Sequence, residues 1–166
     1  MLLRSICAVC TAIALGACQG YSYTLNERTV YEPPKLFHDY AIADDALRAC
    51  VAQAIEDQHI IQPDALRDLN CSNAGIVNLS GIEVFAHLQR LGLDDNKVSD
   101  LAPLYALQKL ELLQIRNNTL RNVSTQLCQG AGKQIALAGN AGLDCARLAA
   151  VTECGVKLID KPSHCQ

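Results

Sequence analysis

The sequence has no tryptophan, and aromatic residues make up only 4% of its 166 residues. This scarcity argues against an aromatic-rich ligand pocket and against a surface on which sugar rings stack. Basic residues are also scarce, because 14 lysines and arginines stand against 17 aspartates and glutamates, which leaves a formal charge of −3. A protein that binds nucleic acid electrostatically needs a basic surplus, so no nucleic-acid partner is expected.

Residue combinations typical of catalysis are also missing. Asp44–Asp45 and Asp94–Asp95 are adjacent acidic pairs. Consecutive strand residues point to opposite faces, and the first pair looks like a helix start, so catalysis by paired carboxylates is not expected. The segment Gly130-Ala131-Gly132-Lys133 is too short for a phosphate-binding loop. Histidines lie without metal-ligand spacing at His38, His59, His87 and His164. We therefore predict no catalytic residues, no metal and no cofactor.

The first 18 residues have the organisation of an export signal. Arg4 supplies a positive charge, and residues 6–15 form an apolar stretch too short to cross a bilayer. The stretch ends in Leu15-Gly16-Ala17-Cys18, which resembles the lipobox of bacterial lipoproteins. The resemblance implies removal of residues 1–17 as a signal peptide and lipidation of Cys18, palmitate included. It also implies a lipid-anchored protein of the bacterial cell envelope, and Gln19 favours the outer membrane. The alternative is a plain secretory signal with an incidental cysteine.

Nine cysteines are too many for an ordinary cytosolic protein. Cys7 and Cys10 leave with the signal peptide, and Cys18 would carry lipid. Six cysteines remain, namely Cys50, Cys71, Cys128, Cys145, Cys154 and Cys165. An even set in an oxidising compartment predicts three disulfides among 15 possible connectivities. A zinc site among the last four is not expected, because they contain no CxxC pair.

Two segments precede the regular part of the chain. Residues 18–40 show neither helical nor alternating apolar spacing, which predicts a lipidated cysteine followed by a tether. The alternative is a strand or loop packed against the domain through Leu36, Phe37 and Tyr40. Residues 41–65 are predicted to form a helical cap, with Asp44 or Asp45 starting a helix that runs to about residue 57.

From residue 66 the apolar positions recur every 22 residues. Three or four units supply the apolar or asparagine residues of each column, and the pattern weakens near residues 126–132. The columns are Leu66, Leu88 and Leu110; Leu69, Leu91, Leu113 and Ile135; Cys71, Leu93, Ile115 and Leu137; Asn96, Asn118 and Asn140; Ile76, Val98 and Leu120; Leu79, Leu101 and Val123; Ile82, Leu104 and Leu148; and Phe85, Leu107 and Val151.

The unit at 88–109 reads as the motif LxxLxLxxNxIxxLxxLxxLxx. It resembles the leucine-rich repeat family, specifically its 22-residue internalin-like class. The resemblance covers residues 66–153, about four coils, and leaves residues 154–166 as a C-terminal cap. It implies an α/β repeat fold, namely a short curved leucine-rich repeat solenoid with a helical N-terminal cap and a C-terminal end stapled by disulfides.

Each coil of such a solenoid buries its leucines only against its neighbours. The asparagine column lies where the strand turns, and its amides can donate to and accept from backbone groups that the turn leaves unpaired. We predict a Cys50–Cys71 disulfide between the helix and the first strand. The other four cysteines would pair as Cys128–Cys154 with Cys145–Cys165, or as Cys128–Cys145 with Cys154–Cys165.

The family geometry implies that strand residues between the inward columns face the concave side, where leucine-rich repeats commonly bind proteins. The candidate partner-binding residues are Asp68, Arg90, Asp94, Leu112, Gln114 and Arg116. The resulting hypothesis is a non-enzymatic protein that recognises or scaffolds a protein partner of the cell envelope, as a monomer or weak dimer. The alternatives are a structural accessory that docks through its tether and cap, and a hydrolase or enzyme inhibitor.

Overall fold

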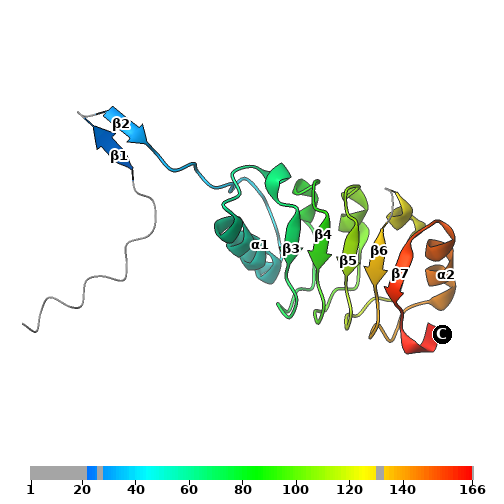
Figure 1. Cartoon of the computed structure of the whole chain (residues 1–166). Coiled ribbons are helices and arrows are strands. Elements are labelled where there is room, and N and C mark those ends of the chain that lie inside the picture. The colour runs from blue at the N-terminus through cyan, green and yellow to red at the C-terminus, as the bar shows by residue number, and fades with distance from the viewer. Residues whose placement is uncertain (1–21, 26–27, 130–132, 166) are drawn as a thin grey trace, which may run out of the picture. The chain divides into compact units, whose positions relative to one another are not determined.

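Parallel strands at the start of successive repeats form a five-stranded sheet (Figure 1). The structure is a computed structural model that describes residues 22–25, 28–129 and 133–165. The strands pair in the order of the sequence, and each pair is parallel. They are β3 (Asp68–Asn70), β4 (Arg90–Gly92), β5 (Leu112–Gln114), β6 (Gln134–Ala136) and β7 (Lys157–Asp160).

Helical segments lie between the strands and at both ends of the sheet. The α-helices are α1 (Asp45–Gln58) and α2 (Cys145–Glu153), and Figure 1 shows them at opposite ends of the sheet. Short 3₁₀ turns lie on the other return paths, namely η2 (Ile82–Val84), η3 (Ala102–Ala106) and η4 (Thr125–Cys128). Two more 3₁₀ turns flank the sheet, since η1 (Pro63–Ala65) precedes β3 and η5 (Ser163–Cys165) follows β7. This arrangement is the repeat-type α/β fold that the sequence predicts.

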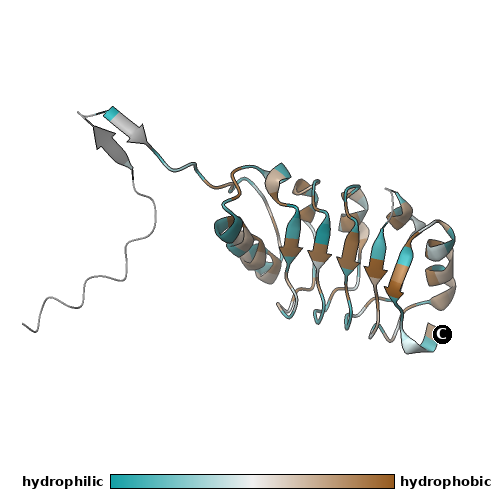
Figure 2. Ribbon diagram, in the orientation of Figure 1, coloured by the Kyte–Doolittle hydropathy of each residue, from teal (hydrophilic) through white to brown (hydrophobic). Residues whose placement is uncertain are grey.

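The 22-residue period of the sequence determines which residues pair between neighbouring strands. Leu69 pairs with Leu91, Leu91 with Leu113, and Leu113 with Ile135, so equivalent residues stack along the solenoid. These leucines and the columns that follow them are buried in one continuous core. Hydrophilic and hydrophobic residues follow one another along the strands (Figure 2). The alternation turns one side chain inward and the next outward, which is what period two requires of a half-buried strand.

A buried asparagine ladder closes the turn after each of three strands, as the sequence predicts. The Asn118 amide donates to the carbonyls of Leu93 and Arg116 over 2.9 and 2.8 Å, and its oxygen accepts from the Val98 N–H over 2.9 Å. Asn96 and Asn140 make equivalent bonds to their own neighbours. Each amide therefore satisfies backbone groups of two coils at once, which locks neighbouring coils together.

The repeat departs from its period towards the C-terminus. Leu127 is buried and Gln126 exposed, so the apolar position in this coil has moved by one residue from the predicted column. Leu158 pairs with Ile135, although the 22-residue spacing points to Lys157, and a bulge follows. The sheet thus gains β7 from residues that the sequence assigns to a C-terminal cap, and α2 takes the place of the short 3₁₀ turns of the earlier return paths.

The carboxylate of Asp44 both caps helix α1 and links it to the first coil. Asp44 accepts the N–H groups of Ala46 and Leu47 as the helix N-cap, both over 3.0 Å. Its other oxygen accepts the N–H groups of Val77 and Asn78 over 2.9 and 3.0 Å. Burial raises the pKa of Asp44, but these four bonds outweigh burial and hold the pKa below its ordinary value of 3.8.

Residues 36–42 pack on the first coil rather than forming part of an open tether. Leu36, Phe37 and Tyr40 contact the core, and the Phe37 and Tyr40 rings lie 6.1 and 5.7 Å from the Phe85 ring. The Phe37 N–H also donates to the Ile60 carbonyl over 2.8 Å. The predicted tether is therefore corrected at this end, where the alternative of a packed loop is right.

The preceding residues belong to a separate unit, which ends at Lys35. Within it, β1 (Tyr23–Leu25) and β2 (Arg28–Tyr31) pair antiparallel. The sequence predicts no strand here, because the segment lacks an alternating apolar pattern. The signal peptide and Cys18 lie outside the described residues. No helix in the described part of the chain is long and apolar enough to cross a membrane.

Three disulfides join the six late cysteines. Cys50 on α1 pairs with Cys71 after β3, as predicted from the sequence. The remaining cysteines pair as Cys128–Cys154 and Cys145–Cys165, which is one of the two arrangements that the sequence left open. The first of these links η4 to the end of α2, and the second links the start of α2 to the C-terminal residues. All three lie at the ends of the solenoid, where fewer coils stack.

Candidate functional site

The outward residues of β3–β7 form what we call the strand face. Its first row contains Asp68, Arg90, Leu112, Gln134 and Lys157. Its second row contains Asn70, Gly92, Gln114, Ala136 and Asp160. Ser72, Asp94, Arg116 and Ala138 follow directly after the strands. All six residues that the sequence nominates for partner binding lie in or beside these rows.

An open hollow of about 470 Å³ lies over the first three strands of this face. Four of the nominated residues line it, namely Asp68, Arg90, Leu112 and Gln114, together with Asn70 and Gly92. Gln58 at the end of α1 completes the lining, and its amide donates to the Asp68 carbonyl over 3.0 Å. The packed helix therefore makes one wall of the hollow, a contribution that the repeat pattern does not reveal.

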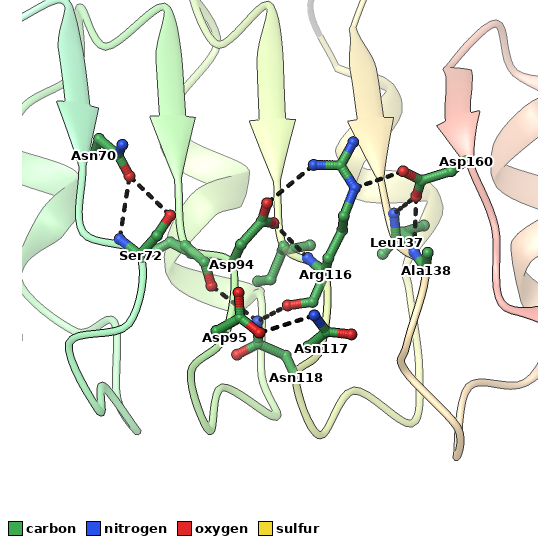
Figure 3. Close-up of polar contacts among 12 residues, drawn as sticks. Asn70, Ser72, Asp94, Asp95, Arg116, Asn117, Asn118, Leu137, Ala138 and Asp160 are labelled. Atoms are coloured by element: carbon green, nitrogen blue, oxygen red, sulfur yellow. Dashed lines mark hydrogen bonds and ion pairs between the residues drawn. The ribbon is translucent and has the colours of Figure 1, made fainter.

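Gly92 lines the hollow and contributes no side chain to it. A Cβ at this position would lie 2.7 Å from Oδ1 of Asn70, so any larger residue would displace the asparagine. Asn70 is itself oriented by Ser72, whose N–H and hydroxyl both donate to Oδ1, over 3.1 and 2.8 Å (Figure 3). Since a backbone N–H can only donate, the Asn70 oxygen must face Ser72 and its NH₂ group is the free end of the amide.

Arg90 is paired with a single carboxylate. Its guanidinium forms an ion pair with Asp68 on the neighbouring strand, and Nη2 donates to Oδ2 over 2.7 Å. The Arg90 side chain remains 62% exposed. A guanidinium carries five N–H donors in a planar fork, so a pair with one carboxylate leaves donors directed to solvent. Arg90 can therefore bind a second acceptor.

Arg116 is enclosed by two carboxylates (Figure 3). Its Nη1 lies 2.9 Å from Asp94 and its Nε 2.6 Å from Asp160, while its own N–H donates to Asp94 over 2.7 Å. The remaining Asp160 oxygen accepts the N–H groups of Leu137 and Ala138 over 2.7 and 2.8 Å. The bonds to Asp160 and Asp94 raise the pKa of Arg116. The network joins β7 to the turns after β4, β5 and β6.

This network changes the interpretation of the six nominated residues. Arg116 and Asp94 are the less exposed pair, with 28% and 20% of their side chains accessible, and they bond mainly to each other and to Asp160. Their bonds within the described part of the chain give these two residues a structural role. The four residues around the hollow are accessible to a partner. Asp160 and Lys157 lie on a strand that the sequence analysis did not predict. The step from Ile135 to Leu158 is 23 residues, one more than the repeat, and this step is the signal that could have located the strand.

The cysteines offer no reactive thiol near the C-terminus. Cys145, His164 and Cys165 lie within 4.8 Å of one another, which is close enough to suggest metal ligands. The two cysteines are joined as a disulfide, however, and a metal-binding thiolate would require that bond to be broken. The His164 ring contacts the Leu143 carbonyl over 2.9 Å, so it is held by the backbone.

No protein-family profile matches the chain, and no curated protein matches it. Among solved structures it is similar to internalin C2 of Listeria monocytogenes, with a TM-score of 0.57 and 26% identity over 72% of this chain. The chain spans 55% of that protein's length. It also matches the CBM51-2 and INT domains of Clostridium perfringens ZmpB, at 27% identity over 49% of this chain and 19% of theirs. That TM-score of 0.38 is too low to carry weight. The internalin likeness supports a leucine-rich repeat fold.

Proposed function

We propose that the strand face recognises a protein partner, so that the chain acts as a non-enzymatic recognition or scaffolding module. The observation that carries this proposal is the open hollow over β3–β5. It joins an arginine with unused donors to an aliphatic side chain and amide groups, a mixture suited to a protein surface. The leucine-rich repeat fold supports it, since parallel repeats present an extended row of adaptable positions.

We further propose that the protein works in the bacterial cell envelope, anchored in the outer membrane by lipid on Cys18. The lipobox-like sequence Leu15-Gly16-Ala17-Cys18 supports the anchor. The three disulfides support an oxidising compartment, because such bonds are rare in the cytosol. Residues 18–35 would then lie between the lipid and the repeat unit.

The two ends of the solenoid are proposed to be caps. Helix α1 and the Cys50–Cys71 disulfide would shield the first coil, and α2 with the C-terminal disulfides would shield the last. An open end of a repeat array exposes apolar residues that no neighbour covers. Capping both ends favours a monomer over association through an open end.

A structural accessory that docks through its N-terminal part is the second candidate. It is favoured by the antiparallel β1–β2 pair, which belongs to a unit separate from the repeats. A partner that binds residues 18–35 would use no residue of the strand face. The two candidates therefore make opposite predictions for substitutions in the hollow.

Crosslinking in intact cells followed by mass spectrometry tests the proposal. We compare the native protein with Arg90→Glu, which reverses an exposed charge at the hollow, and with Lys109→Glu, a matched reversal at an exposed position outside it. Loss of a partner in Arg90→Glu alone supports recognition by the strand face. A partner retained in both variants shifts the site to the N-terminal unit, and identical profiles without any specific partner contradict recognition altogether.

A further inference from the structure

We propose that the strand face binds an extended, acidic segment of its protein partner whose carboxylates are four residues apart, one at Arg90 and one at Lys157. This inference rests on the proposed function and specifies the partner's chemistry. It follows from the distribution of charge along the first row of the face. The row reads Asp68, Arg90, Leu112, Gln134 and Lys157, so two cations flank two uncharged residues.

Both cations are available. Arg90 uses part of its guanidinium on Asp68 and is mostly exposed. Lys157 is exposed, and no carboxylate among the described residues lies within ion-pair distance of its ammonium group. Arg116 differs from both, because two carboxylates already surround its guanidinium. The face therefore offers two separated cationic positions.

The hollow presents N–H donors beside its one cation, Arg90, and its one carboxylate, Asp68, is already paired with that cation. Asn70 has its oxygen turned to Ser72 and presents its NH₂ group. This donor and the free N–H groups of Arg90 line the same hollow. A carboxylate accepts from several N–H groups at once, and an amide beside a guanidinium is a suitable donor set for it. The hollow is therefore better prepared for an anionic group than for a cationic one, Asp68 being already engaged by Arg90.

The spacing of the cations sets the spacing of the ligand. Arg90 lies on β4 and Lys157 on β7, and neighbouring strands lie about 4.8 Å apart, so the two positions are separated by roughly 14 Å. An extended chain advances about 3.3 Å per residue and covers roughly 13 Å in four residues. Side chains two and four residues apart share one side of an extended segment. The residue between the two acids then faces Leu112 and Gln134, where a small apolar side chain fits.

The test uses a fluorescein-labelled peptide with the sequence Gly-Glu-Thr-Val-Thr-Glu-Gly and the oxidised full-length chain, with binding followed by anisotropy. One control peptide carries glutamine in place of both glutamates. A second moves one glutamate by one position, which places the two carboxylates on opposite sides of the segment. We expect binding of the first peptide, weaker binding of the shifted one and the weakest binding for the glutamine version, by about 4- to 25-fold because both exposed ion pairs are lost. Binding should weaken with added salt.

Substitutions in the protein provide a second test, because some should weaken peptide binding and one should strengthen it. Arg90→Gln and Lys157→Gln should each weaken binding about two- to fivefold, the range of exposed ion pairs. Lys161→Gln removes an exposed cation just beyond β7 and should leave binding unchanged. Asp68→Asn should strengthen binding about two- to fivefold, because it releases Arg90 from its competing carboxylate. Local damage to the face would not produce such a gain.

Three results would overturn the inference: equal binding of the glutamate and glutamine peptides, absence of binding to the glutamate peptide, or weaker binding in Asp68→Asn. None of them would contradict the proposed function by itself, because the cellular crosslinks report any partner on the strand face. A partner that is lost in Arg90→Glu, combined with no binding of the acidic peptide, would leave the recognition surface in place and reject the acidic segment.

Discussion

Nε of Arg116 donates to Oδ2 of Asp160 over 2.6 Å, although 44 positions separate the two residues. Arg116 follows β5, Asp160 ends β7, and the whole of β6 with its return helix lies between them in sequence. The Asp160 carboxylate also accepts two N–H groups after β6. One ion pair therefore bridges three strands at the end of the sheet where the repeat is least regular.

Reversing the charge of Arg116 should destabilise the fold, whereas reversing Arg90 should not. Arg116→Glu places a third carboxylate beside Asp94 and Asp160 and should lower the free energy of unfolding by about 2–3 kcal/mol. Arg90→Glu removes a mostly exposed pair and should cost less than about 1 kcal/mol. Urea unfolding followed by circular dichroism measures both. Equal losses would show that the enclosed network contributes no more than the exposed pair.

The asparagine ladder should contribute more stability than its exposed counterparts. Asn118→Ala leaves the Val98 N–H and two carbonyls buried without their partner, and should lower the free energy of unfolding by about 3 kcal/mol. Asn122→Ala, at an exposed position in the next turn, is the matched control and should change it by less than about 0.5 kcal/mol. Similar unfolding midpoints for the two variants would contradict the role assigned to the ladder.

Acid should weaken the attachment of α1 through Asp44. Its folded pKa lies below the ordinary value of 3.8, so its stabilising effect is complete above that value and is lost as the pH falls through the folded pKa. Asp44→Asn retains the helix cap but cannot accept the Val77 and Asn78 N–H groups with its NH₂ end. It should cost about 1–2 kcal/mol near pH 7 and flatten the acid dependence below about pH 4.

The measurement for Asp44 is the unfolding midpoint across an acid titration. Asp45→Asn is the control, because the Asp45 side chain is 88% exposed and lies in the same first turn. A slope that stays as steep in Asp44→Asn as in the native protein would assign the acid sensitivity to other carboxylates. Asp160 is the next candidate, since its pKa is also lowered.

Removing the Cys50–Cys71 disulfide should loosen the N-terminal end before the repeats unfold. The double substitution to alanine should lower the free energy of unfolding by about 3 kcal/mol in the chain-entropy treatment. Hydrogen exchange should rise in α1 and near Gln58, which forms one wall of the hollow, while β5 and β6 stay protected. Unchanged exchange in α1 would mean that Asp44 and the apolar contacts hold the helix without the disulfide.

Periodicity explains why the repeat core could be predicted from the sequence. Leu69, Leu91, Leu113 and Ile135 recur at the spacing of the coil, so their stacking required no long-range information. The role of the asparagine column could be predicted in the same way. An asparagine at a turn after each strand has nearby backbone groups that lack other hydrogen-bond partners. An aspartate N-cap at residue 44 or 45 and the Cys50–Cys71 pair followed from local patterns of the same kind, and the structure selects Asp44 as the cap.

The candidate site could be predicted only in part. The outward positions of β3–β5 follow from those of their inward neighbours, and this was enough to select Asp68, Arg90, Leu112 and Gln114. Sequence did not separate Arg90 from Arg116, because the difference lies in Asp160, which reaches Arg116 from a strand displaced by one residue from the repeat. It also gave no sign that Gln58 and Asn70 would help to line the hollow.

The sequence by itself determined the repeating unit, its strand register, the asparagine ladder and the positions of the outward rows, because each depends on a spacing within one or two coils. The tertiary structure decided which charged side chains are enclosed and which are free, how the C-terminal cysteines pair, and where the sheet ends. These features depend on contacts between residues far apart along the chain. Their formation depends on how irregular coils pack against regular ones, which no local pattern encodes.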